Sequence, residues 1–148
     1  MDELDLRIRN QIYSSFVQTG NAPAPAETAA ALRLAENEVE AALTRLHEAH
    51  ALVLQPDGNG IRMLNPFSAV ETPHRVEAGG RSWFANCAWD ALGIPAALHA
   101  DGRIESVCPD CGEPLELEVG DGALTRGADL LVHFVVPARR WWDDIGFT

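Results

Sequence analysis

The order in which residue patterns follow one another constrains the fold of this chain most strongly. Up to about residue 50 the apolar side chains recur at helical spacing, and beyond that point they form short strand-like runs. Residues 2–19 carry apolar side chains four positions apart, which predicts an amphipathic helix. These side chains are Leu4, Ile8, Ile12 and Phe16. Turn residues and a capping asparagine delimit two further predicted helices, over residues 26–33 and 37–49.

Strand-like runs fill the rest of the chain. Two pairs of runs flank glycine-containing turns and predict β-hairpins. The pairs are residues 52–54 with 61–64 and residues 75–78 with 81–84. Residues 65–74, with two prolines, predict an extended linker between the hairpins. Residues 103–108 and 115–119 alternate like strands, and the continuous apolar run 130–136 predicts a buried central strand.

These patterns predict an α+β fold with segregated helices and strands. We expect a three-helix, winged-helix-like domain over residues 1–66. A mostly antiparallel β core over residues 67–148 would follow it and carry a helix that contains Cys87. The chain ends on a hydrophobic segment without a closing polar tail, so we expect the core to be truncated at its C-terminus.

The charge balance argues against nucleic acid as a partner. The net charge is -11, from 22 acidic and 11 basic residues, and such a chain repels phosphate backbones. The third predicted helix is where a winged-helix protein would contact DNA. With its leading turn, that helix carries Glu36, Glu38, Glu40 and Glu48 against the single arginine Arg45. We therefore expect this helix to have a structural or lid-forming role.

Composition also bears on the cellular compartment. No run approaches the roughly 18 apolar residues of a membrane-spanning helix, so we expect no membrane partner. The acidic N-terminus does not resemble a signal peptide. With three cysteines and no export signal, reduced thiols in the cytoplasm are the expected state.

The apolar stretch 82–95 holds the candidate catalytic pair, Cys87 and Asp90. On a helix, residues three apart share a face, so the thiol and the carboxyl group can meet at one substrate atom. With Asn86 as N-cap, Cys87 would lie in the first turn, where the helix dipole lowers its pKa. Apolar neighbours would keep Asp90 protonated. The aromatic neighbours are Trp83, Phe84 and Trp89. The alternative is that Cys87 is a small buried core residue.

A second motif is the CxxC turn formed by Cys108 and Cys111 between two predicted strands. A structural zinc site needs four ligands, so a three-cysteine chain would require a mixed Cys/His site. A thioredoxin-like redox pair belongs at a helix start, which this turn is not. The remaining interpretation is a tight turn whose thiols face Cys87 and suit a soft metal.

Three features together resemble one known family. They are a hairpin from Val76, the segment Trp-Phe-Ala-Asn-Cys-Ala-Trp-Asp-Ala-Leu-Gly-Ile-Pro-Ala, and a Val-Cys-x-x-x-Gly-x-Pro-Leu strand turn before Val119. This run resembles the organomercurial (alkylmercury) lyases. The resemblance implies that Cys87 is the first catalytic cysteine and Asp90 the catalytic aspartate. Cys108 would correspond to a family cysteine regarded as structural, and Cys111 has no counterpart.

The resemblance implies cleavage of carbon–mercury bonds by protonolysis. Cys87 would bind the mercury of a small organomercury substrate, Asp90 would protonate the carbon, and a hydrocarbon and Hg(II) would form. Trp83, Phe84 and Trp89 would wall the alkyl group. No resident cofactor is required; external thiols or mercuric reductase would take the bound Hg(II), and Cys108 and Cys111 are candidate metal ligands.

One departure from the family leaves alternatives open. The second catalytic cysteine of the family would fall at or just beyond Thr148, where this chain has none. The chain is therefore either a lyase that stops short of that cysteine or a relative that has lost it. A non-catalytic, thiol-based metal- or ligand-sensing winged-helix protein is the main alternative. Recruitment of the same pair to other chemistry is a third.

Overall fold

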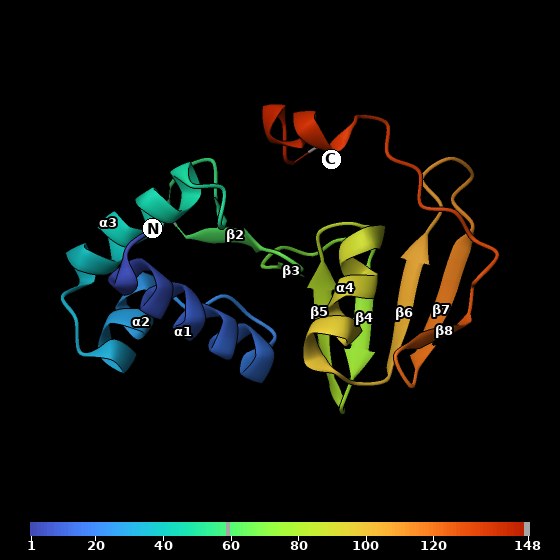
Figure 1. The fold of residues 1–148 in the computed structure, drawn as a ribbon, viewed down its shortest axis with the longest axis horizontal. Coiled ribbons are helices and arrows are strands. Elements are labelled where there is room, and N and C mark those ends of the chain that lie inside the picture. The colour runs from blue at the N-terminus through green and yellow to red at the C-terminus, as the bar shows by residue number, and fades with distance from the viewer. Residues whose placement is uncertain (59, 147–148) are drawn as a thin grey trace.

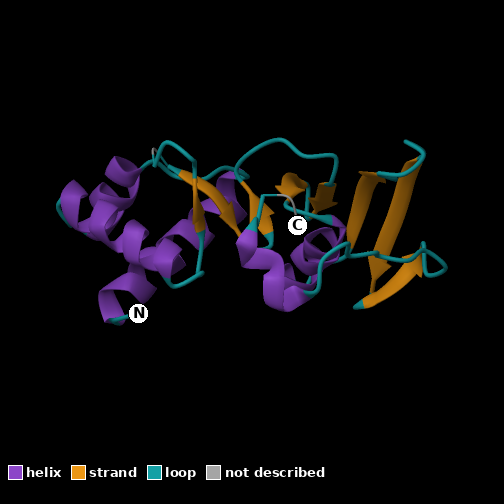
Figure 2. Cartoon of the chain, turned by 90° about the horizontal axis from the view of Figure 1, so that it is seen from above, coloured by secondary structure: helices purple, strands orange, loops and turns teal. Residues whose placement is uncertain are grey.

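The structure, a computed structural model, describes residues 1–58 and 60–146. Three helices come first, as predicted, with each bound within one residue of that expected. They are α1 (Glu3–Thr19), α2 (Pro25–Leu32) and α3 (Glu36–Glu48). They pack together at one end of the molecule, and the strands extend away from them (Figure 1; Figure 2).

Local capping explains where α1 begins and ends. The Asp2 side chain accepts the N–H of Asp5 at 2.8 Å, and the Asp5 carboxylate accepts the N–H of Asp2 at 3.2 Å, a reciprocal capping arrangement. Gly20 ends the helix in the left-handed conformation, with φ +76°. The predicted apolar stripe is confirmed, because the side chains of its last three members are fully buried. They are Ile8, Ile12 and Phe16.

All the strands described by the structure form one antiparallel sheet in the order β1-β2-β3-β5-β4-β6-β7-β8. Their bounds are β1 (Val53–Leu54), β2 (Ile61–Leu64), β3 (Phe67–Ser68), β4 (Arg75–Ala78), β5 (Arg81–Ala85), β6 (Gly102–Val107), β7 (Pro114–Gly120) and β8 (Ala123–Arg126). Both predicted hairpins are confirmed, β1 with β2 and β4 with β5.

The predicted extended linker contains the strand β3 and is part of the sheet. This strand pairs with β2 on one side and with β5 on the other, so the sheet continues through the expected boundary between residues 66 and 67. That this boundary separates two folding units stays a prediction.

Helix α4 (Ala88–Leu98) covers one face of the sheet and contacts β4, β5 and β6. Its buried Ile94 belongs to one core cluster with Val76 of β4 and Ile104 of β6. Pro95 lies inside this helix, which continues to Leu98. The ring of Pro95 packs against Gly102, where a Cβ would lie 2.8 Å from its Cγ.

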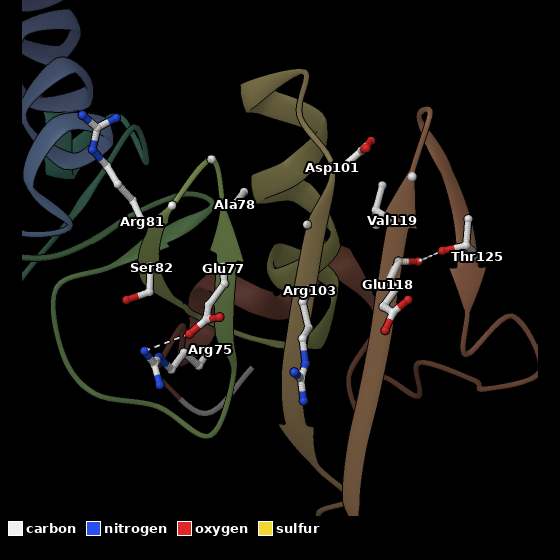
Figure 3. Close-up of a pocket in the computed structure, with 14 residues that line it drawn as sticks. Arg75, Glu77, Ala78, Arg81, Ser82, Asp101, Arg103, Glu118, Val119 and Thr125 are labelled. Atoms are coloured by element: carbon white, nitrogen blue, oxygen red, sulfur yellow. Dashed lines mark hydrogen bonds and ion pairs between the residues drawn. The ribbon is translucent and has the colours of Figure 1, made fainter.

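The opposite face of β4, β6 and β7 is charged and partly hollowed (Figure 3). Arg75 pairs with Glu77 at 3.0 Å along β4, and Arg103 of β6 pairs with Glu116 of β7 at 2.7 Å. Exposed pairs of this kind contribute little to stability. They do keep this face of the sheet polar, which suits contact with water.

The prediction of a central strand over residues 130–136 is wrong. The chain forms β8 at the sheet edge instead, and residues 128–136 run without strand structure to a short 3-10 helix at Ala138–Asp143. Two side chains of the apolar run are largely exposed, Leu131 at 93% and Val135 at 75%. A continuous apolar run has no periodicity that assigns it to a strand, which explains the error.

No helix in residues 1–58 or 60–146 is both long and apolar enough to cross a bilayer.

The end of α1 is joined to β5 by buried contacts. Trp83, 4% exposed, donates its indole N–H to the Phe16 carbonyl at 2.7 Å. Next to this bond, a Cβ on Gly20 would lie 2.9 Å from the backbone oxygen of Ser82. The helical region therefore approaches the sheet so closely that only glycine fits at position 20.

We predict that Gly20→Ala destabilises the protein more than Gly80→Ala. Both glycines have φ +76°, so both substitutions cost about 1–2 kcal/mol of left-handed strain. Only position 20 adds a clash, worth roughly 1–3 kcal/mol, because nothing lies within 4 Å of a Cβ on Gly80. Urea denaturation measures both free energies of unfolding, and equal losses would contradict this account of the junction.

Candidate active site

Cys87 lies at the point where β5 ends and α4 begins. Its backbone is extended, with φ -151°, and its Sγ accepts the N–H of Asp90 at 3.5 Å. Cys87 is therefore the N-cap itself. The prediction that Asn86 caps the helix and that Cys87 lies in the first turn is wrong by one residue. The reason is that the Asn86 side chain is used elsewhere, in hydrogen bonds to two other side chains.

The cap brings the predicted pair together. Asp90 donates its backbone N–H to the Cys87 sulfur at 3.5 Å, so the thiol and the carboxyl group lie together at the start of α4, and both residues are partly buried. Burial raises the pKa of Asp90, against the opposing effect of hydrogen bonds from Asn86 and Cys87, so the predicted direction is confirmed.

The prediction that the pKa of Cys87 is lowered is wrong. Burial raises the pKa of this thiol, and the negative charge of Asp90 raises it further. Hydrogen bonds from the backbone of Asp90 and Trp89 act in the other direction but are outweighed. The pair therefore holds protons more tightly than two solvated groups would, and the thiol is not a free thiolate.

A hydrogen-bond chain connects the pair to α1. The Asn86 amide donates to the Asp90 carboxylate at 3.0 Å and to the Asn65 side-chain oxygen at 3.2 Å. The Tyr13 hydroxyl donates to the backbone oxygen of Asn65, and Arg9 donates to that hydroxyl at 3.1 Å. Sequence analysis missed Asn65 and Tyr13, because only folding brings them near Asp90.

The three aromatic side chains predicted to line the substrate pocket lie in different environments. Trp83 lies in the core against Phe67, at a ring-centroid distance of 6.1 Å. Phe84, its neighbour on β5, faces the other side of the sheet, since side chains alternate along a strand. Trp89 is 60% exposed and contacts Phe134 edge to face at 6.4 Å.

The C-terminal segment supplies aromatic residues that sequence analysis did not select. Phe134 also contacts Trp141, at 4.8 Å between ring centroids. In Figure 1 this segment returns from β8 over the end of the sheet towards the helical region. Trp89, Phe134 and Trp141 thus form an apolar cluster beside the first turn of α4.

Cys108 and Cys111 lie in the turn between β6 and β7, as predicted. The pKa of Cys108 is lowered by hydrogen bonds from the backbone of Cys111 and Asp110 and from the Cys111 thiol. No cluster of three or more potential metal-ligating side chains occurs within the described residues. The structure therefore gives no support to a mixed Cys/His zinc site or to a joint site with Cys87. The family's second cysteine was expected at or beyond Thr148, which lies outside the described residues.

Comparison with known proteins decides the family. A family model for alkylmercury lyase (MerB) matches residues 67–148, more than half of the chain. The chain belongs to the alkylmercury lyase family. This match includes Cys87, Asp90, Cys108 and Cys111 within its bounds.

Individual members of the alkylmercury lyase family match over shorter stretches. An alkylmercury lyase of Pseudomonas putida is 35% identical over 69 residues, which cover 45% of this chain and 32% of that protein. One of Bacillus cereus is 40% identical over 50 residues, covering 34% of this chain and 23% of that protein. Each match thus spans less than a third of the relative.

The fold also agrees with a solved member of the family. The crystal structure of the mercury-bound form of MerB2 matches with a TM-score of 0.70 and 27% sequence identity. The match covers 85% of this chain and 60% of that chain. It extends beyond the 82 residues of the family model, so the shared architecture includes part of the region before residue 67.

We predict that Asp90→Asn becomes more stable than the parent protein as the pH rises. The folded-state pKa of Asp90 is raised above its unfolded value of 3.8. Its contribution to stability is therefore complete below pH 3.8 and is lost as the pH rises through the folded-state pKa. Asparagine does not ionise, so the stability difference should widen across that interval and then stay constant.

Urea denaturation from below pH 3.8 to neutrality measures this difference. A second comparison pairs the Asn86→Ala variant with the double variant Asn86→Ala and Asp90→Asn. The Asn86→Ala substitution removes an amide whose hydrogen bond favours the Asp90 anion. It should raise the Asp90 pKa further and extend the interval to higher pH. A stability difference that is independent of pH would show that Asp90 is not perturbed by burial.

Proposed function

We propose that this protein cleaves the carbon–mercury bond of small organomercury compounds by protonolysis. Cys87 binds the mercury and Asp90 delivers the proton. The observation that carries the proposal is that Cys87 caps α4 by accepting the Asp90 N–H, which places a partly buried thiol beside a partly buried carboxyl group. Membership of the alkylmercury lyase family supports it.

The first step uses the proximity of the thiol and the carboxyl group. Mercury is a soft cation that prefers thiolate sulfur. When R–Hg⁺ meets Cys87, a sulfur–mercury bond forms and the thiol proton moves to the Asp90 carboxylate. The raised pKa of Asp90 makes it a suitable acceptor, because its neutral form is favoured by burial. A thiol that begins protonated thus supplies the proton that the reaction needs.

The second step breaks the carbon–mercury bond. Asp90 transfers its proton to the carbon. The electron pair of the carbon–mercury bond forms the new carbon–hydrogen bond, and the hydrocarbon R–H leaves. Hg(II) stays on the Cys87 sulfur. Two external thiols then take the Hg(II) as a bis-thiolate, so that R–Hg⁺ and two thiols give R–H, the bis-thiolate and one proton. Mercuric reductase is the proposed recipient of the released Hg(II).

The surroundings of the pair support this chemistry. Asn86 orients the Asp90 carboxylate through its 3.0 Å hydrogen bond. The cluster of Trp89, Phe134 and Trp141 offers apolar surface for the organic group of the substrate. Trp83, buried in the core, positions β5 and hence Cys87. The reaction needs reduced thiols, so we place the protein in the cytoplasm.

We predict that Cys87→Ser abolishes benzene release from phenylmercury in the presence of excess thiol. Serine oxygen is a poor ligand for a soft cation, so only the thiol-alone background should remain. Asp90→Asn should slow release by at least about a hundredfold, the usual contribution of a general acid. Gas chromatography of the headspace measures both.

Two comparisons make this test specific. Ser82→Ala changes an exposed side chain on β5 and should retain the parent rate. Asp90→Asn should still bind phenylmercury at Cys87, seen as one more blocked thiol than in Cys87→Ser, although it releases little benzene. Undiminished release from Cys87→Ser, or no release from the parent chain, would refute the proposal.

We also propose that the helical region supports the site and does not bind nucleic acid. Arg45, the single arginine of α3, is held by the buried Asp5 carboxylate at 2.6 Å. Hydrogen bonding to Arg45 lowers the pKa of Asp5, so the pair stays ionised. An arginine engaged in this way is poorly placed to contact phosphates, and the first turn of α3 adds Glu36 and Glu38.

We therefore predict no shift of duplex DNA fragments in a gel at low salt, where electrostatic binding is strongest. The measurement should be repeated with phenylmercury and with HgCl₂. A shift under any of these conditions, together with mercury binding but no hydrocarbon release, would favour the alternative of a thiol-based sensor.

A further inference from the structure

The turn between β6 and β7 holds two thiols close together. The N–H of Cys108 donates to the Glu113 carbonyl, and the N–H of Gly112 donates to the Cys108 carbonyl, both at 2.9 Å. Gly112 has φ +74°, which lets the chain reverse at once. Cys108 and Cys111 are therefore three residues apart within one tight turn. Backbone hydrogen bonds therefore hold the pair in place before any ligand arrives.

This pair lies at the same end of the sheet as Cys87. Strands β5 and β6 are both antiparallel to β4 and so run in the same direction (Figure 1). Phe84 of β5 and Glu105 of β6 both pair with Arg75. Cys87 and Cys108 each follow three residues later. With about 4.8 Å between neighbouring strands, the two chain segments are roughly 10 Å apart, so the CxxC turn is a separate site.

The number of available ligands selects the kind of metal. Zinc requires four protein ligands in a structural site. Residues 1–58 and 60–146 offer no third metal-ligating side chain next to the pair. Two thiolates are sufficient only for a soft cation that accepts two sulfur ligands. Cys111 is exposed, so such a cation can reach the turn from solvent.

We propose that Cys108 and Cys111 form a second thiophilic site that chelates one Hg(II). Two sulfur–mercury bonds form, and the two thiol protons pass to the solvent, with no change of oxidation state. The site does not depend on carbon–mercury cleavage at Cys87. It provides this protein with a place to hold inorganic mercury apart from the proposed catalytic pair.

Three single variants test the proposal, because each leaves two thiols in the full chain. Cys87→Ser keeps the CxxC pair, Cys111→Ser keeps Cys87 with Cys108, and Cys108→Ser keeps Cys87 with Cys111. Each is loaded with one equivalent of HgCl₂ and dialysed against increasing glutathione. Bound mercury and free thiols are then measured.

Cys87→Ser should retain one Hg(II) per chain with both thiols blocked. It should require at least about tenfold more glutathione to lose the metal than the other two variants, because its second thiol acts at high effective concentration. Equal loss from all three variants would overturn the proposal, as would mercury that bridges two chains in native mass spectrometry.

Folding of the variants is checked by thermal unfolding. Cys111 is exposed, so Cys111→Ser should fold, and its comparison with Cys87→Ser is decisive if Cys108→Ser does not. The benzene assay is not used here. Failure of the proposed lyase activity would therefore leave this result unaffected, and failure of mercury chelation would leave the lyase proposal standing.

Discussion

The hydrogen bond from the Asp90 N–H to the Cys87 sulfur determines the geometry of the whole site. It makes Cys87 the cap of α4 and sets the helix to begin at Ala88. Asp90 is the third residue of the helix, the position whose N–H a capping side chain reaches. The cap therefore keeps the Asp90 carboxyl group at the same end of the helix as the thiol.

Burial then gives the pair its chemical character. Burial raises the pKa of the thiol and of the carboxyl group, and the negative charge of Asp90 raises the pKa of the thiol further. The Asn86 amide donates a hydrogen bond to the Asp90 carboxylate at 3.0 Å. Proton transfer within the pair suits a reaction that consumes a proton at carbon while sulfur binds a soft metal.

The helical region contributes to the site through packing and hydrogen bonds. Tyr13 reaches Asn65, whose side chain receives the Asn86 amide. Trp83 joins β5 to the end of α1 through its bond to Phe16. The pKa of Tyr13 is raised by burial and also by the charge of Asp90, despite the opposing charge of Arg9. Residues remote in sequence thus share the electrostatic environment of the pair.

The sequence by itself determined the features that depend on neighbours along the chain: the buried stripe of α1, the hairpin at Gly79 and Gly80, and the spacing of Cys87 and Asp90. Tertiary structure decided the rest. The pKa of Cys87 follows burial more than its place at a helix start, and the apolar run 130–136 lies outside the sheet because β8 pairs with β7. Local hydrogen bonding and periodicity are encoded over a few residues, whereas burial depends on which distant segments cover a side chain.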